Sequence, residues 1–319
     1  MSAPEETALL FSGSSHPSLA KEIAGAAGIK LGEVELKTFP DGELYCQIKE
    51  NVRGHDVYLV QSVCTHPNRY LMELLLMVDA VKRASARSIV AVLPYFPYAR
   101  QDRRDQPRVP ITARLVADIL QVAGVRQVVT MDLHTDQLQG FFDIPVENLA
   151  ARPCLIEAFR AQAGDELVVA TPDVGSVKLA REYALELDVN LVIVDKERVN
   201  ATEVAVTTVI GDVKGKDVLL ADDMCSTAGT LVSAAKACHE KGARRVFAAA
   251  THGLFVGESI ERIEASPIEA MIVSNTVPLN RQAAQCSKIH TASVASLFGQ
   301  AIQCILSAKS ISSMCHCGV

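Results

Sequence analysis

Three segments of the chain repeat one pattern: a helix end, a turn of small residues, a basic residue and an apolar strand. They are KRASARSIVAVLPYF at 82–96, QVAGVRQVVTMDLH at 121–134 and HEKGARRVFAAATHG at 239–253. Strands that alternate with helices in this way predict mainly parallel sheets with flanking crossover helices. The first and third segments lie at corresponding places in two halves, so we expect two similar α/β domains in tandem, residues 1–150 and 151–319.

Composition supports a globular, non-membrane protein. The chain has 319 residues, enough for two domains, and 49% of them are hydrophobic while 21% are charged. The net charge of -6 argues against a nucleic-acid partner. Mean hydropathy is +0.19, yet Glu73 and Asp79 interrupt the longest apolar run, 70–81, so we expect no membrane span. The N-terminus lacks a basic signal-peptide region, and the nine cysteines form no disulfide framework, which favours the cytoplasm.

The segment 216–242 most directly indicates a ligand. An apolar strand at 218–221 precedes Asp222 and Asp223, a loop of small and hydroxylated residues follows at 225–230, and helical spacing then begins. Amides at a helix N-terminus favour an anion, whereas carboxylates suit sugar hydroxyls or a metal ion. The pattern therefore fits a phosphorylated sugar. An ordinary strand–helix turn with an Asp or Ser cap explains this segment about equally well.

Two other segments suggest a nucleotide. Residues 94–110 hold three aromatic residues, four prolines and four arginines after a strand end. Guanidinium groups bind phosphates and aromatic rings stack on bases, so we favour a nucleotide over a solvated loop of paired charges. The sequence FPDGE at 39–43 adds acids and an aromatic ring, although a plain turn between strands is the commoner explanation. The strands on either side of it, 33–39 and 44–48, are expected to belong to the main sheet.

Further polar residues follow predicted strand ends. Asp132 and His134 suit Mg²⁺ or general-base chemistry, and Asp173 follows a later strand. Lys196 and Arg198 alternate on a polar segment that a surface hairpin would also explain. Ligands of parallel α/β sheets bind outside the carboxyl ends of the strands, so these residues are expected to converge.

Six motifs, in this order and at about this spacing, resemble one family. They are FPDGE, PYFPYARQDRRD, MDLHTDQLQGFFDIPVENL, TPDVG, VDKER and LLADDMCSTAGT. They are similar to the ribose-phosphate diphosphokinases, or phosphoribosyl pyrophosphate synthetases, of the phosphate-activated class. The resemblance runs from about residue 9 to about residue 312, and LHTDQLQGFF and YFPYARQDR are highly specific to this family.

The resemblance implies two phosphoribosyltransferase-type domains and an enzyme of nucleotide biosynthesis. The first domain would supply the ATP side and subunit contacts, and the second the ribose 5-phosphate loop. The implied reaction is Mg²⁺-dependent transfer of the β,γ-diphosphate of ATP to the C1 hydroxyl of ribose 5-phosphate. The products would be phosphoribosyl pyrophosphate and AMP. The family usually forms homohexamers built from dimers, and inorganic phosphate is the implied activator.

The resemblance also assigns residues to each ligand. Those expected to bind ATP are Phe39, Asp41, Gly42, Glu43, Arg100 and Gln101. Those expected to bind ribose 5-phosphate are Arg198, Asp222, Asp223, Ser226, Thr227, Ala228, Gly229 and Thr230. The expected metal ligands are His134 and Asp173, with Asp132 as a further candidate. Lys196, Arg198 and His134 would be catalytic, and Arg104, Ser310 and Ser312 would belong to a regulatory phosphate site.

The chain departs from the family pattern at three places. Ser226 stands where the family usually has Asp, Ser176 stands where it usually has Gly, and the tail lacks a usual aromatic residue. Two alternatives stay open: a non-catalytic regulatory homologue of the synthetase, and a phosphoribosyltransferase that consumes phosphoribosyl pyrophosphate. The presence of Lys196, Arg198 and His134 argues against the regulatory homologue, and the two-domain length argues against the phosphoribosyltransferase.

Overall fold

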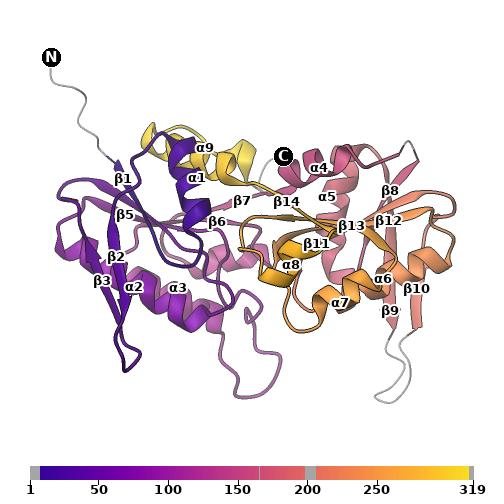
Figure 1. The fold of residues 1–319 in the computed structure, drawn as a ribbon, viewed down its shortest axis with the longest axis horizontal. Coiled ribbons are helices and arrows are strands. Elements are labelled where there is room, and N and C mark those ends of the chain that lie inside the picture. The colour runs from indigo at the N-terminus through magenta and orange to yellow at the C-terminus, as the bar shows by residue number, and fades with distance from the viewer. Residues whose placement is uncertain (1–7, 165, 198–205, 316–319) are drawn as a thin grey trace. The chain divides into compact units, whose positions relative to one another are not determined.

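The chain folds into two compact α/β units. The computed structural model describes residues 8–164, 166–197 and 206–315 (Figure 1). Contacts divide the chain after Ala150 and again after Ser293, so that 151–293 form the second unit and the flanking segments form the first. Both units are built on mainly parallel sheets with flanking helices, which confirms the expected fold class. Within the described ranges, no helix is both long enough and apolar enough to span a bilayer.

The first unit is centred on a five-stranded sheet in the order β1-β4-β5-β6-β7, with every neighbouring pair parallel. The strands are β1 (Ala8–Ser12), β4 (Asp56–Val60), β5 (Ser88–Leu93), β6 (Gln127–Met131) and β7 (Val146–Leu149). Most of their residues are buried, because helices cover both faces and the apolar runs therefore need no alternation. Strand β7 was not expected from the sequence, since VENL is short and half polar.

The strands β2 (Val34–Thr38) and β3 (Leu44–Ile48) correct the sequence prediction. We expected them to lie in the main sheet, but they pair antiparallel with each other as a separate two-stranded sheet. Burial alternates along β3, because one of its faces packs on α2 (Pro67–Arg83) and the other is exposed, whereas β2 shows no such alternation. The FPDGE turn is the tip of this hairpin, so it projects from the main sheet.

The first unit also includes the C-terminal helix, which is the second correction. We expected 294–319 in the second domain, yet α9 (Ala295–Leu306) packs against α1 (Pro17–Ala27). Gln303 Nε2 donates to the Ala27 carbonyl at 3.2 Å, and the Met314 carbonyl accepts from the Ala150 amide at 3.0 Å. These partners are far apart in sequence, so no local pattern indicates the contact. The remaining helices of the unit are α3 (Thr112–Ala123), η1 (Asp136–Phe141) and η3 (Ser312–Met314).

The second unit has a seven-stranded sheet in the order β10-β9-β8-β11-β12-β13-β14, parallel except for β10 on β9. The strands are β8 (Leu167–Thr171), β9 (Asn190–Glu197), β10 (Val206–Ile210), β11 (Asp217–Cys225), β12 (Arg245–Gly253), β13 (Ile268–Ser274) and β14 (Ile289–Ala292). From β8 the chain continues to β9 on one side of the sheet, whereas from β11 it continues to β12 on the other side, so the strand order reverses between β8 and β11. Such a topological switch point is where open α/β sheets bind ligands.

Helices cover both faces of this sheet (Figure 1). They are α4 (Arg152–Arg160), η2 (Val174–Ser176), α5 (Val177–Leu187), α6 (Gly229–Glu240), α7 (Ser259–Glu264) and α8 (Arg281–Gln285). Helix α5 contacts β8 and β11 and also packs with α4, whereas α6 contacts β11 and β12 and packs with α7. Buried apolar side chains of the strands and of the flanking helices form the core of this unit.

Candidate functional site

The carboxyl ends of β8 and β11 bring three acids together at the switch point. Asp173 follows β8 and caps η2, its Oδ1 accepting from the Ser176 amide at 3.1 Å. Asp222 and Asp223 belong to β11, which runs to Cys225 and not only to Ala221 as the sequence predicted. The strand continues because residues 222–225 pair with β12, a partner that the local sequence does not reveal.

Asp222 is a buried acid among other acids. Asp222 is only 8% exposed. Its Oδ1 accepts from the Ser176 hydroxyl at 2.7 Å and from the Asp223 amide at 3.0 Å. Burial raises the pKa of the Asp222 carboxyl to about 8, the charges of Asp223 and Asp173 act in the same direction, and the Ser176 hydrogen bond opposes them. A ligand that donates hydrogen bonds to this carboxyl would favour its ionised form.

The loop 226–230 leads from β11 into α6. Ala228 has φ 60° and ψ 0°, a left-handed conformation, and it occupies the N-cap position of α6 without a side-chain cap bond. Two loop carbonyls accept hydrogen bonds from the segment 256–262. The Val256 amide donates to the Ser226 carbonyl at 2.9 Å, and Arg262 Nη1 donates to the Thr227 carbonyl at 3.4 Å. The left-handed residue and the helix N-terminus together form the backbone arrangement that binds phosphate groups.

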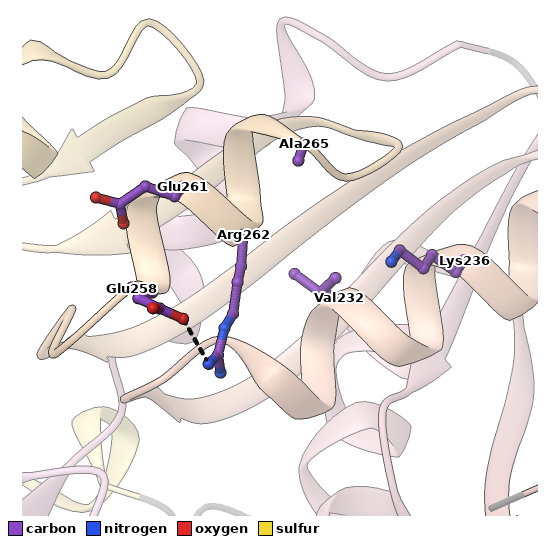
Figure 2. Close-up of a pocket in the computed structure, with 6 residues that line it drawn as sticks. All are labelled: Val232, Lys236, Glu258, Glu261, Arg262 and Ala265. Atoms are coloured by element: carbon purple, nitrogen blue, oxygen red, sulfur yellow. Dashed lines mark hydrogen bonds and ion pairs between the residues drawn. The ribbon is translucent and has the colours of Figure 1, made fainter. Parts of the chain in front are cut away.

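A surface pocket lies between α6 and α7, and Arg262 is one of the residues that line it (Figure 2). Its volume is about 440 Å³, and none of the predicted site residues lines it. Arg262 lines this pocket, pairs with Glu258 at 3.2 Å and also reaches the Thr227 carbonyl. Arg262 is therefore a residue that supports the loop and that the sequence analysis missed, since an Arg four residues after a Glu on a helix is typical of any exposed surface.

The third segment of the second unit is only partly described. The backbone of Lys196 lies in β9, in register with Thr207 of the edge strand β10. Arg198 lies outside the described residues. Strand β9 is the parallel neighbour of β8, so the backbone of Lys196 lies toward the same edge of the sheet as Asp173.

In the first unit, the ends of β5 and β6 also lie side by side, because these strands are parallel neighbours. Asp102 Oδ2 accepts from the Thr135 hydroxyl at 3.0 Å and from Gln137 Nε2 at 3.2 Å. This carboxylate joins the arginine-rich segment to the segment that contains His134. Asp102 was not among the predicted site residues, because its place in the sequence suggests an ion pair with the neighbouring arginines.

His134 is exposed at the end of β6, and the turn before it is unusual. Asp132 is buried and has a φ of 39°, in a backbone region that residues other than glycine rarely adopt. The turn is held by two hydrogen bonds: the Asp132 amide donates to the Leu149 carbonyl at 2.9 Å, and the Leu133 amide donates to Asn148 Oδ1 at 3.1 Å. Strand β7 thus positions His134.

The residues expected at a nucleotide are exposed. Arg100 is open to solvent, and Gln101 accepts from the Thr112 hydroxyl through Oε1. The tip 39–43 is closed by the Gly42 amide, which donates to the Phe39 carbonyl at 2.9 Å, and Phe39 is 48% exposed. The structure connects the segments of Gln101 and His134 through Asp102.

The two residues of the predicted regulatory site in the tail lie close to each other. The Ser310 and Ser312 hydroxyls are 2.9 Å apart and both residues are exposed. The Ser310 hydroxyl also accepts from the Ser312 amide at 3.3 Å. In the described part of the chain, no hydrogen bond joins Arg104 to either serine, so the two parts of this prediction stay separate.

Comparison with known proteins assigns both halves of the chain to one kind of enzyme. Residues 8–124 match the family model described as the N-terminal domain of ribose phosphate pyrophosphokinase, and residues 197–316 match the phosphoribosyl synthetase-associated domain. A ribose-phosphate pyrophosphokinase from Wolinella succinogenes is 49% identical over 305 residues, covering 96% of this chain and 98% of the relative. One from Chlorobaculum tepidum is 50% identical, covering 95% and 93% respectively.

A solved structure agrees with these sequence relatives. The phosphoribosylpyrophosphate synthetase from Mycobacterium smegmatis is 38% identical and superimposes with a TM-score of 0.89. The match covers 95% of this chain and 99% of that chain. The similarity therefore extends through both units.

Proposed function

This chain belongs to the ribose-phosphate pyrophosphokinase family, and from that premise we propose that it catalyses diphosphate transfer from ATP to ribose 5-phosphate. The C1 hydroxyl oxygen attacks the β-phosphorus of ATP, the bond from that phosphorus to the α–β bridging oxygen breaks, and AMP leaves. The hydroxyl proton is released, and phosphoribosyl pyrophosphate is formed. The observation that carries the proposal is the pairing of buried Asp222 with the phosphate-type loop at the switch point.

Ribose 5-phosphate is the ligand that suits this edge of the second sheet. The loop residues Ser226, Thr227, Ala228, Gly229 and Thr230 bind the 5-phosphate through backbone amides and hydroxyl groups. Asp222 and Asp223 accept hydrogen bonds from the vicinal ribose hydroxyls. Ser226 supplies a neutral donor, which avoids an additional negative charge beside the phosphate. Arg198, which lies outside the described residues, is proposed to bind the same sugar phosphate.

ATP is bound by residues of the first unit in this proposal. Arg100 and Gln101 contact the nucleotide, and Phe39, Asp41, Gly42 and Glu43 hold its base and ribose. The hairpin tip projects from its own main sheet, which suits a tip that serves the site of a neighbouring subunit. His134, Lys196 and Arg198 act on the transferring phosphates, where cationic and hydrogen-bonding groups stabilise the charge that develops on the oxygens.

Magnesium fits the donor set. Among the residues described, no group of three or more His, Cys, Asp or Glu side chains could hold a metal ion alone. Mg²⁺ usually takes only one or two carboxylates and completes its coordination with water and substrate phosphates. Asp173 in the second unit and His134 in the first are the proposed Mg²⁺ ligands, with Asp132 as a further candidate, and each is of a kind that can bind an ion that arrives with ATP. When bound, the ion would offset the negative charge of the phosphate oxygens.

The proposal extends to assembly, location and regulation. Large apolar side chains are exposed on the first unit, including Met72 on α2, which suits self-association as dimer-based hexamers. Inorganic phosphate is the proposed activator, with Arg104, Ser310 and Ser312 as its ligands. The cysteines of the described residues are all free thiols, in keeping with the proposed cytoplasmic location.

The test is to incubate the pure full-length protein with Mg²⁺, ATP and ribose 5-phosphate and to follow products by ³¹P NMR. We expect AMP and phosphoribosyl pyrophosphate in equal amounts. Asp222→Asn should lower kcat/KM for ribose 5-phosphate by roughly tenfold or more, since a charged hydrogen-bond acceptor is lost. Binding of both substrates without AMP would instead support a regulatory homologue. Consumption of phosphoribosyl pyrophosphate with a purine base would support a phosphoribosyltransferase.

A further inference from the structure

Ser176 lies between Asp173 and Asp222 at the switch point, and its hydroxyl does not cap the helix that it begins. It is the last residue of η2 and the N-cap residue of α5. Serine is favoured at this position because its hydroxyl caps the free amides of the first helical turn. Here the hydroxyl makes no cap bond to the helix.

The Ser176 hydroxyl is directed to β11 instead. Its oxygen lies 2.7 Å from Asp222 Oδ1 and 3.4 Å from Asp173 Oδ1. A serine hydroxyl has a single proton, and the shorter contact identifies Asp222 as its acceptor. Asp173 is already engaged by the Ser176 backbone amide at 3.1 Å. Ser176 therefore connects the β8 turn to the buried acid of β11.

The bond restricts how the Asp222 carboxyl can rotate. Oδ1 accepts from the Ser176 hydroxyl on one side and from the Asp223 amide on the other, at 3.0 Å. Two donors on one oxygen hold the plane of the carboxyl in one orientation. The Asp223 donor is part of the backbone of β11 itself, whereas Ser176 is a side chain from a different element. Removal of the Ser176 hydroxyl would leave the carboxyl fixed from one direction only.

We propose that Ser176 is a positioning residue for ribose 5-phosphate, whose hydroxyl orients the Asp222 carboxyl to accept the vicinal hydroxyls of the sugar. This inference rests on the proposed function, because it requires that Asp222 binds the sugar. It predicts that Ser176 contributes to discrimination between ribose 5-phosphate and a sugar phosphate that lacks one of those hydroxyls. The residue touches neither the reacting atoms nor the nucleotide in this proposal.

The first measurement is binding of ribose 5-phosphate, without ATP, by isothermal titration calorimetry. Ser176→Ala should raise Kd by about five- to tenfold, whereas Ser176→Thr keeps the hydroxyl and should stay within about twofold of the wild type. Ser287→Ala, in an exposed turn of the same unit, is the matched control and should leave Kd unchanged. In steady-state assays of Ser176→Ala, KM for ribose 5-phosphate should rise with kcat nearly unchanged.

The second measurement separates positioning from general loosening of the loop. 2-Deoxyribose 5-phosphate lacks one hydroxyl of the pair, so Ser176→Ala should weaken its binding less than it weakens ribose 5-phosphate binding. Equal weakening of both sugars would overturn the proposal, as would a Ser176→Ala variant with wild-type affinity for ribose 5-phosphate. If the wild-type protein binds neither sugar, the proposed function itself fails, which is a different result from an unaffected variant.

Discussion

At the scale of single residues, the second unit holds an acid in surroundings that oppose its charge. The Asp222 carboxyl is buried beside Asp223, and its pKa is raised to about 8. A group of this kind is common at functional sites, because ligand binding can supply the partners that folding leaves out. Asp132 is unusual in its backbone instead: its φ of 39° is stabilised by hydrogen bonds from this turn to β7.

Lys196 offers the sharpest residue-scale prediction of the catalytic proposal. Lys196→Ala should lower kcat by about 100- to 1,000-fold. We expect the loss of this cation to weaken transition-state stabilisation by about as much as the loss of an oxyanion-hole donor, on the order of 2.7–4 kcal/mol. KM for ribose 5-phosphate should change little. Lys241→Ala, at an exposed position after α6, is the matched control. Steady-state kinetics that show an unchanged kcat and a raised KM would refute the catalytic role.

At the scale of elements, helix packing decides where the C-terminal segment belongs. Gly299 of α9 lies so close to α1 that an added Cβ would be 2.6 Å from the Ala26 Cβ and 2.8 Å from its backbone carbon. Only a residue without a side chain allows this approach. In contrast, a Cβ added at Gly25 of α1 would meet nothing within 4 Å.

These two glycines make a matched pair of substitutions. Gly299→Ala should destabilise the protein by about 1–3 kcal/mol, because the contact with α1 must open. Gly25→Ala should stabilise it by up to about 1 kcal/mol, because alanine is the better helix former and has room. Chemical denaturation measures both. Stabilisation by Gly299→Ala would show that α9 does not depend on this close approach.

At the scale of the whole molecule, stability of the second unit depends on a buried charge that joins distant segments. Asp217 is fully buried and accepts from Arg244 Nε at 2.8 Å and from the Gly164 amide at 3.0 Å, while Arg245 pairs with the same carboxylate. Burial alone would raise the pKa of Asp217, but the hydrogen bonds from Arg245 and Arg244 outweigh it and hold the pKa well below its usual range.

The depressed pKa gives the pH dependence a definite sign. The unfolded chain takes up a proton on Asp217 near pH 4, before the folded protein does, so this contribution to stability is present above about pH 4 and is lost as the pH falls further. Asp217→Asn should be less stable by about 1–3 kcal/mol at pH 7 and should lose less on acidification. Urea unfolding at several pH values measures both, with Asp143→Asn, an exposed acid, as control. Parallel pH curves for the wild type and Asp217→Asn would contradict the prediction.

Self-association is the second prediction at this scale. Met72 is 50% exposed on α2, next to the β2–β3 sheet, where a monomer would leave an apolar side chain in water. Sedimentation velocity should show the wild type as an assembly well above the 34.3 kDa of one chain. Met72→Glu should shift it to smaller species, and Leu185→Glu on α5 of the second unit should not. A wild type that sediments as a monomer would refute the assembly proposal.

The alternating pattern was enough to predict the parallel sheets, and local signals placed most strands and helices within a few residues. The acids, the arginine-rich segment and the phosphate-type loop were also visible as local composition. Two of the errors depended on a partner far away in the chain: pairing with β12 extends β11 past Ala221, and packing on α1 recruits α9. The third concerned neighbours, because β2 and β3 pair only with each other and do not join the main sheet.

The sequence by itself determined the α/β class, the family and the residue types of both expected ligands, because periodicity and motif order are properties of neighbouring residues. Only the tertiary structure decided that Ser176 bonds Asp222 rather than its own helix, that Asp102 joins the two segments of the first unit, and that Arg262 supports the loop. Each of these contacts joins groups more than thirty residues apart. Hydrogen bonds over such separations form only when the sheet order has brought the strand ends together.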